Sequence, residues 1–534
     1  METRLDGTYQ HRQKTIGLGT LFVLIGIIAM LAMASYFTTR VVLLARARYG
    51  GLEVAVSIAL IAAEMFVLIH AFGYVLSVVR ALLGQPRIQA AVLKNPEDFP
   101  HVDILVPARH EPRAILERTL TALAGLHYPN KTIWLLDDSS ESRHIDEAAE
   151  LAEAFGVKLF RRERRSGAKA GIINACLEGL EGKYVALFDA DQCPMPFFLN
   201  RIVPVLEADA QMAFVQTPQF YANIHQNRVA RAAGAQQAVF YEYICEAKAA
   251  ATSAFCCGTN VVFRRDALTE VGGLDTNSVT EDFATSVKIH AAGWKSLYYG
   301  EAYTMGLGPE TLTAYFRQQY RWARGTLGVG RQLLKRLVTA PRSLSPLQWM
   351  DYGLSSTFYL IGWAYLILML CPILYIVAGI PSYFVRSEVY FMAFLPYILF
   401  AVAVYIGGLR RRRYTLTQML QGVLLVFLAA PVHIRASLAA LLDRPSRFRV
   451  TPKGLSETIG LKAIWPQVTI CTANYLVFLW GFSQMVFERD FAAGINGFWA
   501  GVHFAAFWSV FYFREAITQD EKGLATKLEM EMAS

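Results

Sequence analysis

The sequence is poor in charge and in cysteine, and both shortages exclude classes of protein. Only 18% of its 534 residues are charged whereas 54% are hydrophobic, a balance too apolar for an ordinary soluble enzyme. The seven cysteines include no Cys-x-x-Cys pair, which argues against a disulfide framework and against a zinc site. No internal repeat or low-complexity tract is visible. A membrane protein that carries a soluble domain in a reducing compartment fits these absences.

The net charge of +8 does not indicate nucleic-acid binding. Lysine and arginine gather beside apolar stretches, as they do at 410–413. This placement is typical of cytoplasmic loops that meet anionic lipid. We therefore expect the lipid bilayer, and no nucleic acid, among the partners.

Six uncharged or nearly uncharged runs are long enough to cross roughly 30 Å of hydrocarbon. The first begins near Gly17, and no small-residue cleavage site follows it, so we interpret it as a retained span and not as a signal peptide. The sequence thus predicts a multi-pass membrane protein. The six runs are 17–37, 54–79, 353–379, 390–408, 467–486 and 495–513.

Basic residues beside these runs predict their orientation. They precede the first run, follow the second from Arg80 onward, and follow the fourth at 410–413. Because Lys and Arg concentrate on the cytoplasmic side, six spans place all three clusters in the cytoplasm, together with the long segment between the second and third runs. Arg40, Arg46 and Arg48 oppose this orientation, and we expect a short interfacial helix to hold them at the headgroups.

Two features inside the apolar segments leave alternatives open. The segment 414–442 is apolar enough for a seventh span, but it contains Pro431 and His433, and an interfacial helix that feeds a cytoplasmic loop suits it better. Glu64 and His70 lie in the second run, where ionisable side chains are costly. They either line a hydrated channel or make polar contacts between packed helices.

The segment 97–345 has normal charge density and is predicted to form an α/β domain. Short apolar strands alternate in it with helical patterns, and two of the strands end at Asp137-Asp138 and at Asp189. In a mostly parallel sheet the carboxyl ends of the strands share one rim, where ligands bind. These carboxylates therefore predict a site at that rim. The strands concerned are Val102–Val106, Thr132–Leu136 and Tyr184–Phe188.

The triplet Asp189-Ala190-Asp191 places two carboxylates on a strand-to-loop turn. Oxygen ligands of this kind suit a Mg²⁺ or Mn²⁺ ion that keeps its phosphate ligands. Asp137-Asp138 can contact a nucleoside, and the segment 165–171 supplies cations and glycines that let the backbone approach a ligand. Solvated turns and a solvated basic face are the alternatives at these positions.

Two further motifs add acidic, basic and aromatic groups. Thr280-Glu281-Asp282 precedes a helical pattern, where one acidic residue is explained by capping. Gln318, Arg321 and Trp322 lie on one helix turn, so that an amide, a guanidinium and an indole come together. The guanidinium can neutralise a diphosphate, and the indole can stack on a pyranose ring. The alternative is an interfacial Trp/Arg anchor beside the third run.

The polar stretch 448–454 lies between the segment 414–442 and the fifth run. It offers the hydroxyl of Thr451, the ammonium of Lys453 and a glycine, which are the groups that a mobile loop closing over a nucleotide needs. A basic juxtamembrane linker is the alternative.

Taken in order, these motifs resemble the processive family 2 glycosyltransferases of the cellulose synthase and curdlan synthase type. The resemblance covers residues 50–515, almost the whole chain, and it implies a bacterial inner-membrane protein whose cytosolic GT-A domain is inserted in an α-helical transmembrane domain. It rests on the ordered set and not on any single motif. The set is Asp137-Asp138, Lys169 to Gly171, Asp189 to Asp191, Phe255 to Thr259, Thr280 to Asp282, Gln318 to Trp322 and Phe448 to Lys453.

The resemblance also implies a role for each residue. Asp282 is expected to be the catalytic base of a single inverting displacement, and Asp189 and Asp191 are expected to bind the metal ion and UDP. Further substrate contacts are expected from Asp137, Lys169, Cys257, Thr280, Glu281, Gln318, Arg321 and Trp322, and from a gating loop with Phe448, Thr451 and Lys453.

The implied activity is the polymerisation of glucose from UDP-glucose with export of the growing β-glucan chain. Ser139 follows the first aspartate pair where cellulose synthases more often have glycine, and the sequence stops soon after its last apolar run, where the bacterial enzymes usually carry a β-barrel that binds cyclic di-GMP. Both departures favour a β-1,3-glucan product of the curdlan type. Cellulose and mixed-linkage glucan are the alternatives.

Two rival functions come from other classes of protein. A nucleotide-binding transporter without transferase activity would leave Asp282 and the helix turn with Arg321 without a task. A transferase that adds one sugar to a lipid would not need the closing loop and six spans. We therefore expect UDP-glucose, the glucan, the bilayer and accessory secretion subunits as partners.

The predicted organisation has five segments. The first and last are membrane helices, the second is the catalytic domain with its interfacial helices, and the fourth carries the interfacial helix and the gating loop. The boundaries are 1–96, 97–345, 346–413, 414–464 and 465–534.

Overall fold

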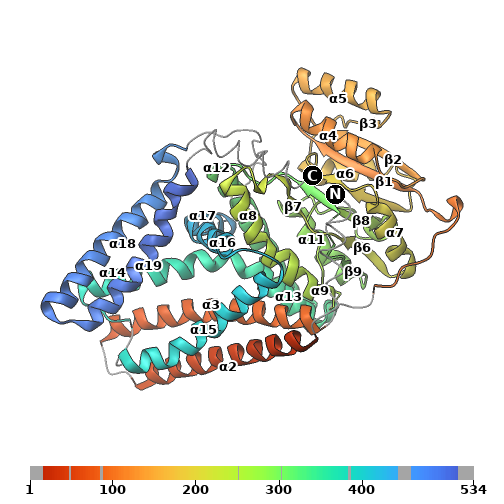
Figure 1. The fold of residues 1–534 in the computed structure, drawn as a ribbon. Coiled ribbons are helices and arrows are strands. Elements are labelled where there is room, and N and C mark those ends of the chain that lie inside the picture. Colours follow the sequence, from red (N-terminus) through yellow and green to blue (C-terminus); the bar gives the residue numbers. More distant parts are fainter. Residues whose placement is uncertain are drawn as a thin grey trace.

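The structure is a computed structural model that describes residues 16–46, 50–83, 88–250, 252–301, 303–382, 387–442 and 459–514. It consists of an α/β domain and a bundle of long apolar helices, which lie side by side (Figure 1). The predicted loop residues Phe448, Thr451 and Lys453 lie outside the described residues.

The α/β domain is built on a seven-stranded sheet with the order β3-β2-β1-β4-β8-β6-β9. Neighbouring strands are parallel except at β8, which is antiparallel to both β4 and β6. The mostly parallel sheet predicted from the sequence is therefore confirmed. The strands are β1 (Val102–Ala108), β2 (Lys131–Asp137), β3 (Lys158–Phe160), β4 (Tyr184–Leu187), β6 (Met212–Gln216), β8 (Val261–Arg264) and β9 (Lys295–Tyr298).

Helices cover both faces of this sheet. Ile104 and Val106 of β1 belong to one apolar core, together with residues of α4, α5 and α7, whereas Leu105 belongs to a second core with α6, α10 and α11. Burial on both faces explains why the strands are continuously apolar. The helices are α4 (Arg113–Ala124), α5 (Ser142–Phe155), α6 (Ala168–Leu177), α7 (Phe198–Ala208), α10 (Arg265–Glu270) and α11 (Glu281–Ala291).

A small second sheet lies beside the first and has the order β5-β10-β7. β10 is antiparallel to β5 and parallel to β7. After β10, the chain continues through Gly308, Pro309 and Glu310 to α12 (Leu312–Thr339). The strands are β5 (Cys193–Pro194), β7 (Phe220–Tyr221) and β10 (Thr304–Gly306).

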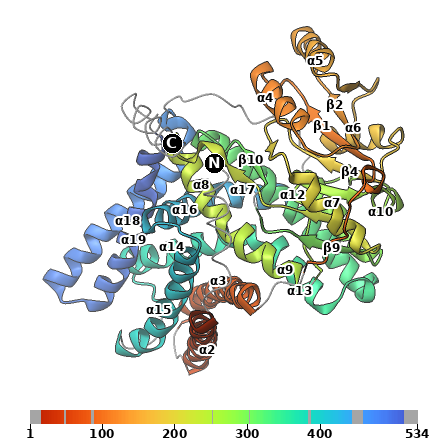
Figure 2. The ribbon, with the colours of Figure 1, turned by 45° about the vertical axis from the view of Figure 1, so that its right-hand side comes forward.

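Five helices of the described residues are long and apolar enough to cross a membrane, at Thr20–Arg46, Gly51–Leu83, Pro346–Ala378, Val389–Arg411 and Trp465–Glu488. They correspond to the first five predicted spans. The sixth predicted span forms a helix that packs along its neighbour on the side of the bundle away from the large sheet (Figure 2), but it is not among the five. The bundle helices are α2 (Ile16–Arg46), α3 (Gly51–Leu83), α14 (Ile361–Ala378), α15 (Ser387–Arg411), α18 (Trp465–Ser483) and α19 (Phe491–Arg514).

The segment 414–442, for which the sequence allowed an interfacial helix or a seventh span, forms a bent pair of helices. They are α16 (Leu416–Leu428) and α17 (Ala430–Leu441). They meet at 44°, and together they are apolar enough for one broken span or a re-entrant loop. α16 packs against α8 (Arg228–Val239) and α19, and α17 packs against α14. The pair is therefore enclosed by other helices and does not lie alone on the surface of the bundle.

Ion pairing, and not an interfacial helix, accounts for Arg40, one of the three arginines that opposed the predicted orientation. Arg46 is the last residue of α2, and Arg48 lies outside the described residues. α2 continues without a break through Arg40, whose Nε lies 2.7 Å from Glu64 Oε2 of α3. The hydroxyl of Tyr36 donates to the other carboxylate oxygen at 2.9 Å. His70 takes the plainer of its two predicted roles, because its Nε2 lies 3.2 Å from the carbonyl oxygen of Leu354 on the neighbouring helix.

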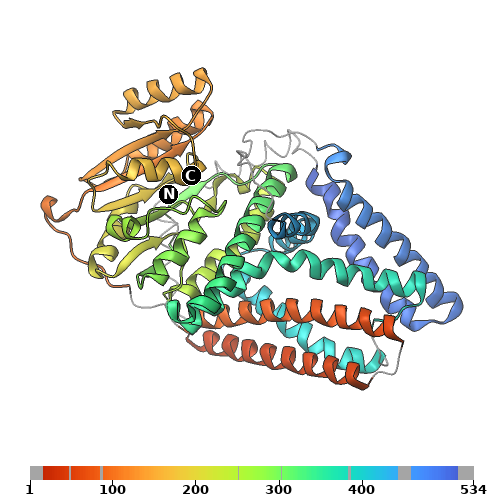
Figure 3. The same cartoon turned by 180° about the vertical axis from the view of Figure 1, so that it is seen from behind.

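The junction between the two parts is made by α8, α9 (Glu246–Ala249), α12 (Leu312–Thr339) and α13 (Pro346–Thr357). α12 begins after Thr311, whose hydroxyl accepts the backbone N–H of Ala314 at 3.1 Å. Seen from behind, it runs between the sheet and the bundle (Figure 3), and it packs against α11, α13 and α17. One helix thus touches both the α/β domain and the apolar helices.

Candidate active site

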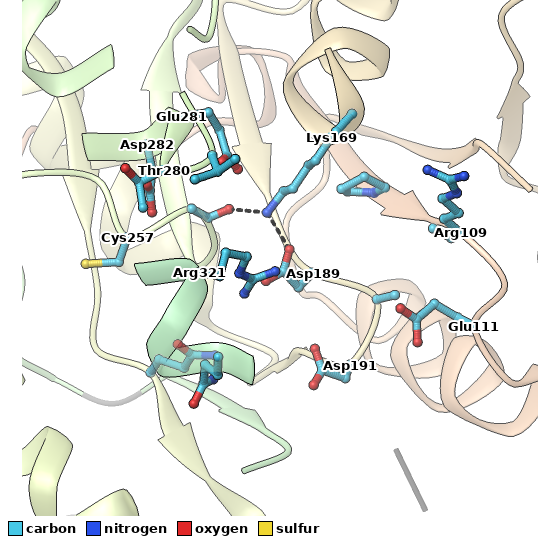
Figure 4. Close-up of a pocket in the computed structure, with 18 of the residues that line it drawn as sticks. Arg109, Glu111, Lys169, Asp189, Asp191, Cys257, Thr280, Glu281, Asp282 and Arg321 are labelled. Carbon is cyan, nitrogen blue, oxygen red and sulfur yellow. Dashed lines mark hydrogen bonds and ion pairs between the residues drawn. The ribbon is translucent and has the colours of Figure 1, made fainter. Parts of the chain in front are cut away.

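An open cleft lies where the carboxyl ends of β1, β2 and β4 face α12 (Figure 4). The cleft is open to solvent, so a ligand can enter it from the surface. The chain therefore brings residues that are far apart in sequence to the rim that the strand pattern predicts. Ten predicted site residues line the cleft: Lys169, Asp189, Asp191, Cys257, Thr280, Glu281, Asp282, Gln318, Arg321 and Trp322.

Lys169, in the first turn of α6, lies at the centre of the cleft. Its ammonium donates to Asp189 Oδ1 in a short ion pair and to the carbonyl oxygen of Gly258 at 2.7 Å (Figure 4). Burial alone would lower the pKa of Lys169, but the carboxylates of Asp189 and Glu281 outweigh it, and the pKa is raised. Lys169 therefore stays charged at neutral pH.

Gly258 is the point at which the backbone comes closest to the acidic residues of the cleft. Its φ of +83° is a conformation that side chains disfavour. A Cβ at this position would lie 3.1 Å from Asp282 Oδ2 and 3.7 Å from Lys169 Nζ. Glycine is therefore the residue that lets the carbonyl reach Lys169 while the carboxylate of Asp282 lies alongside.

Asp282 is in the first turn of α11, and its Oδ1 accepts its neighbour's backbone N–H, that of Phe283, at 2.8 Å. Burial and the adjacent carboxylate of Glu281 raise the pKa of Asp282 to about 7, against the opposing effects of the Phe283 N–H, Lys169 and Arg321. A carboxyl group with a pKa near the working pH is suited to accept a proton during a reaction. Thr280 and Glu281 precede it and also line the cleft.

The two carboxylates after β4 fit a divalent cation. Asp189 and Asp191 both line the cleft, and the backbone N–H of Asp189 donates to the hydroxyl of Thr259 at 2.8 Å. Across the described segments, no group of three His, Cys, Asp or Glu side chains is placed to hold a metal. Two carboxylates suit a divalent cation that keeps waters and phosphate oxygens as its other ligands.

Only one residue of the pair Asp137-Asp138 lines the cleft. Asp137 is buried at the end of β2, where it accepts from Arg161 Nε at 2.8 Å, and it is not among the residues that line the cleft. Asp138 does line the cleft, and Arg162 holds it through two nitrogens at 3.0 and 2.8 Å. Asp138 thus lines the cleft, and a substrate contact of Asp137 stays a prediction.

α12 is held tightly against the segment that carries Asp282. A Cβ on Gly325 would lie 2.5 Å from the Cγ2 atom of Thr280, so this close approach requires glycine. One turn earlier, Gln318, Arg321 and Trp322 reach the cleft together, as their spacing predicts.

Cys257 closes the cleft near Asp282 (Figure 4). It is half-buried, and its backbone N–H donates to the Oε1 atom of Gln216 at 2.8 Å. The preceding residue, Cys256, donates its N–H to the hydroxyl of Ser286 on α11 at 2.8 Å. This stretch of chain is thereby tied both to β6 and to the helix that begins at Asp282.

Four charged or polar side chains of the cleft were not predicted from the sequence. Arg109 and Glu111 follow β1 on the side opposite to Asp282 (Figure 4), while Gln219 and Glu310 line the cleft on loops of the small sheet. The rule that placed Asp189 at the rim applies equally to the end of β1, so Arg109 and Glu111 were within its reach. The other two lie on loops whose course the sequence pattern does not fix.

Comparison with known proteins identifies the class of this domain. The model of the family described as "Glycosyltransferase like family 2" matches residues 100–325. A mannosyltransferase from Pyrobaculum calidifontis, solved with GDP-Man and Mn²⁺, superposes with a TM-score of 0.51 over 73% of this chain and 99% of its own, at 19% identity. This likeness shows the fold. Residues 100–325 are therefore a family 2 glycosyltransferase domain with a GT-A-like fold.

Curated relatives show which glycosyltransferases this chain is similar to. The UDP-forming cellulose synthase catalytic subunit of Pseudomonas fluorescens is 27% identical over 80% of this chain and 57% of its own length. Cellulose synthase 2 of Novacetimonas hansenii is 26% identical over 84% of this chain and 28% of its own. The chain thus spans little more than half the length of the first relative and less than a third of the length of the second. The resemblance to family 2 glycosyltransferases of the cellulose synthase type is confirmed.

The raised pKa of Asp282 predicts a pH-dependent effect of Asp282→Asn on stability. A carboxyl group whose folded-state pKa is raised to about 7 stabilises the fold fully below its unfolded pKa, and this stability is lost as the pH rises through about 7. The neutral amide avoids that loss. At pH 8 the variant should therefore melt a few degrees above the wild type, and the difference should shrink toward pH 5.

Melting in detergent, followed by tryptophan fluorescence at both pH values, measures this difference. Asp146→Asn, at an exposed position of α5, is the matched control and should show no pH-dependent change relative to the wild type. Equal melting temperatures of Asp282→Asn and wild type at pH 8 would show that the Asp282 carboxylate costs the fold nothing.

Proposed function

We propose that this protein is a processive, inverting β-glucan synthase that polymerises glucose from UDP-glucose in the cytoplasm and passes the polymer outward through its membrane helices. The observation that carries the proposal is Asp282, a carboxyl group with a pKa of about 7 that shares one cleft with Lys169 and Arg321. The relatives support it, since their names give them as UDP-forming cellulose synthases.

On the donor side, the proposal assigns the diphosphate to the cationic centre of the cleft. Lys169 and Arg321 offer positive charge to the departing UDP, and Asp138 and Arg109 lie at the ends of neighbouring strands for the nucleoside. Mg²⁺ or Mn²⁺, held by Asp189 and Asp191, would neutralise charge on the diphosphate.

On the acceptor side, Asp282 takes the proton of the attacking hydroxyl group. The hydroxyl oxygen forms a bond to the anomeric carbon while the bond from that carbon to UDP breaks, so an α-linked donor gives a β-linked product. Trp322 offers a ring face on which the acceptor sugar can stack, and Cys257 lies beside it on the cleft wall. A transporter that only bound nucleotide would have no use for a carboxyl group of this kind.

A second cavity supports the proposed outward path. It lies among α2, α3, α14, α15 and α19 and is lined by aromatic rings, among them Tyr397 and Trp499. Tyr365 and Phe427 stack in its wall with ring centroids 4.5 Å apart, and the carboxylate of Glu64 faces it. Aromatic faces with few polar groups are typical of surfaces that bind sugar rings.

Between the cleft and this cavity, α12 meets the bent pair of helices. Gln319 Oε1 lies 3.4 Å from Nε2 of the buried His433 on α17, and the ring of Tyr359 packs edge-on against His433 at 5.2 Å. We propose that the polymer passes this contact. We also propose, from the sequence motif, that Phe448, Thr451 and Lys453 form a loop that closes over the nucleotide.

For the product, we propose a β-1,3-glucan, because Ser139 follows the aspartate pair. Cellulose is the second candidate, since the relatives are named as cellulose synthases. The orientation of the acceptor hydroxyl over Asp282 decides between them. Accessory secretion subunits are proposed as partners.

Replacing the proposed base should abolish polymer formation without weakening UDP binding. Asp282→Asn keeps the shape of the side chain but cannot accept a proton, so we expect kcat to fall by about 10²- to 10⁴-fold. In the wild type, kcat/KM should rise with pH through about 7 as Asp282 loses its proton. Radiolabelled polymer and UDP affinity are measured side by side, and normal polymer output from Asp282→Asn would refute this role.

The linkage is tested by digestion of the product. Purified protein is incubated with Mg²⁺ and radiolabelled UDP-glucose, and the insoluble product is treated separately with β-1,3- and β-1,4-glucanases. We expect release by the β-1,3 enzyme alone. Release by the β-1,4 enzyme would transfer the proposal to cellulose, and cleavage only by a mixed-linkage enzyme would transfer it to a mixed glucan. No product from UDP-glucose would contradict the proposed donor.

The outward path is tested at the second cavity. Trp499→Ala removes a large ring from its wall, so we expect shorter or less glucan while UDP affinity stays normal. Trp508→Ala, at an exposed position of the same helix, is the matched control. Chain length is measured on sizing columns after equal UDP release. Products of equal length from both variants and the wild type would exclude this cavity from the path.

A further inference from the structure

A second cluster of buried charged groups lies behind the cleft, at the junction of the two parts of the molecule. We call Arg80, Lys248, Ser253 and Asp351 the junction cluster. Arg80 of α3 donates to Asp351 Oδ1 of α13 at 3.2 Å and to the carbonyl oxygen of Ala247 at 2.8 Å. The hydroxyl of Ser253 donates to the other oxygen of Asp351 at 2.5 Å.

Lys248, on α9, is the most unusual member, because it is only 3% exposed. Its ammonium donates to the backbone carbonyl of Asp351 and to the hydroxyl of Ser355, both at 3.0 Å. Burial lowers the pKa of Lys248, and the nearby carboxylate of Asp351 opposes this effect. A buried ammonium is costly wherever an apolar side chain would fit, so a stable fold alone does not explain why lysine is placed here.

The junction cluster holds the stretch of chain that leads to the acceptor side of the cleft. Ser253 begins a segment, residues 253–257, that is neither helix nor strand. Its backbone N–H donates to the carbonyl oxygen of Lys248 at 3.1 Å. The ammonium of Lys248 also lies 4.9 Å from the centre of the Phe255 ring. Two residues further on, Cys257 lines the cleft.

Aromatic contacts connect the segment 253–257 to α11, the helix that carries Asp282. The ring of Phe255 packs edge-on against Phe283, with centroids 4.9 Å apart, and Phe283 contacts Tyr352 at 5.4 Å. Phe283 is the residue whose backbone N–H donates to Asp282. The side chain next to the proposed base is therefore packed against residues that the junction cluster holds.

A buried histidine makes a second connection between the same elements. The hydroxyl of Ser296 donates to the carbonyl oxygen of Ala254 at 2.5 Å, so it accepts from Nε2–H of His290 at 2.8 Å. Nδ1 of His290 then accepts the hydroxyl of Tyr352 at 2.6 Å. Burial, with a smaller effect from Lys248, lowers the pKa of His290 to about 3, so the ring is neutral, as this assignment requires.

We propose that Lys248 and Asp351 are positioning residues for the acceptor side of the cleft, which tie α3 and α13 to the segment 253–257 and to the helix of Asp282. This inference rests on the proposed function of the cleft. The donor side, by contrast, is held by Lys169 and by the strand ends of the sheet. Disturbing the junction cluster should therefore affect the acceptor and the chain length, and leave the nucleotide site intact.

The experiment uses the full-length protein and the variants Lys248→Met and Asp351→Asn. We expect the maleimide labelling rate of Cys257, measured by mass spectrometry, to change several-fold in each, because the wall that carries it shifts. The KM for an oligosaccharide acceptor should rise several-fold and products should shorten, while the affinity for UDP and the KM for UDP-glucose stay within twofold of the wild type, a margin of roughly 0.4 kcal/mol. Lys335→Met, at an exposed position of α12, is the control and should match the wild type.

Several outcomes decide the proposal. Unchanged Cys257 labelling, or equal losses of donor and acceptor affinity, would overturn it. The double variant should be less impaired than the sum of the two single variants, because both residues act through the same segment, 253–257, and the second substitution adds little once that segment has shifted. Should the charge variants fail to fold, Ser253→Ala removes only the hydroxyl bond to Asp351, and it should still change Cys257 labelling. Labelling and UDP binding need no polymerisation, so a change in labelling without any polymer from the wild type would retain the positioning role and reject the proposed function.

Discussion

The partly buried ion pair between Lys169 and Asp189 is the interaction on which the cleft depends. The ammonium of Lys169 also reaches the carbonyl oxygen of Gly258, so one side chain joins α6, the end of β4 and the loop beside Asp282. Without its positive charge, three carboxylates of the cleft would face one another in a partly buried space. With it, the carboxyl group of Asp282 keeps a pKa of about 7, where it can still lose its proton. The geometry and the electrostatics of the site thus have the same source.

Much of the site could be predicted because it depends on local patterns. The apolar runs of β1, β2 and β4 are buried on both faces, and the residues that follow them come to one rim by the geometry of a parallel sheet. The spacing of Gln318, Arg321 and Trp322 needs only a helix. The strand pattern could not predict which of Asp137 and Asp138 lines the cleft. This depends on how Arg161 holds Asp137 and Arg162 holds Asp138, and each arginine lies 24 residues further along the chain.

The membrane part shows the same limit. Long apolar helices were predictable from composition, but the meaning of Arg40 was not, because a rule for orientation counts arginines without knowing their partners. Arg40 is 2% exposed and paired with Glu64, so it says nothing about which side of the membrane its end of α2 occupies. Each residue is unusual in its own apolar helix, but only the packing of α2 on α3 shows that the two are partners. The same packing places Glu64 in the wall of the aromatic cavity.

The two walls of the cleft differ in what supports them, and this difference constrains how synthesis and export can be coupled. The donor wall is made from strand ends and α6 within the sheet domain. The acceptor wall is made by α12 and by Cys257, and both are fastened to helices that belong to the bundle or touch it. Arg321 and Trp322 of α12 line the cleft, whereas Gln319 of the same helix contacts His433 of α17. In the proposed function, Trp322 contacts the acceptor and Arg321 the departing diphosphate, so a shift of the bundle helices that reached α12 would move both contacts relative to the strand ends of the sheet. The proposed polymerase needs such a movement to advance its product by one sugar after each transfer.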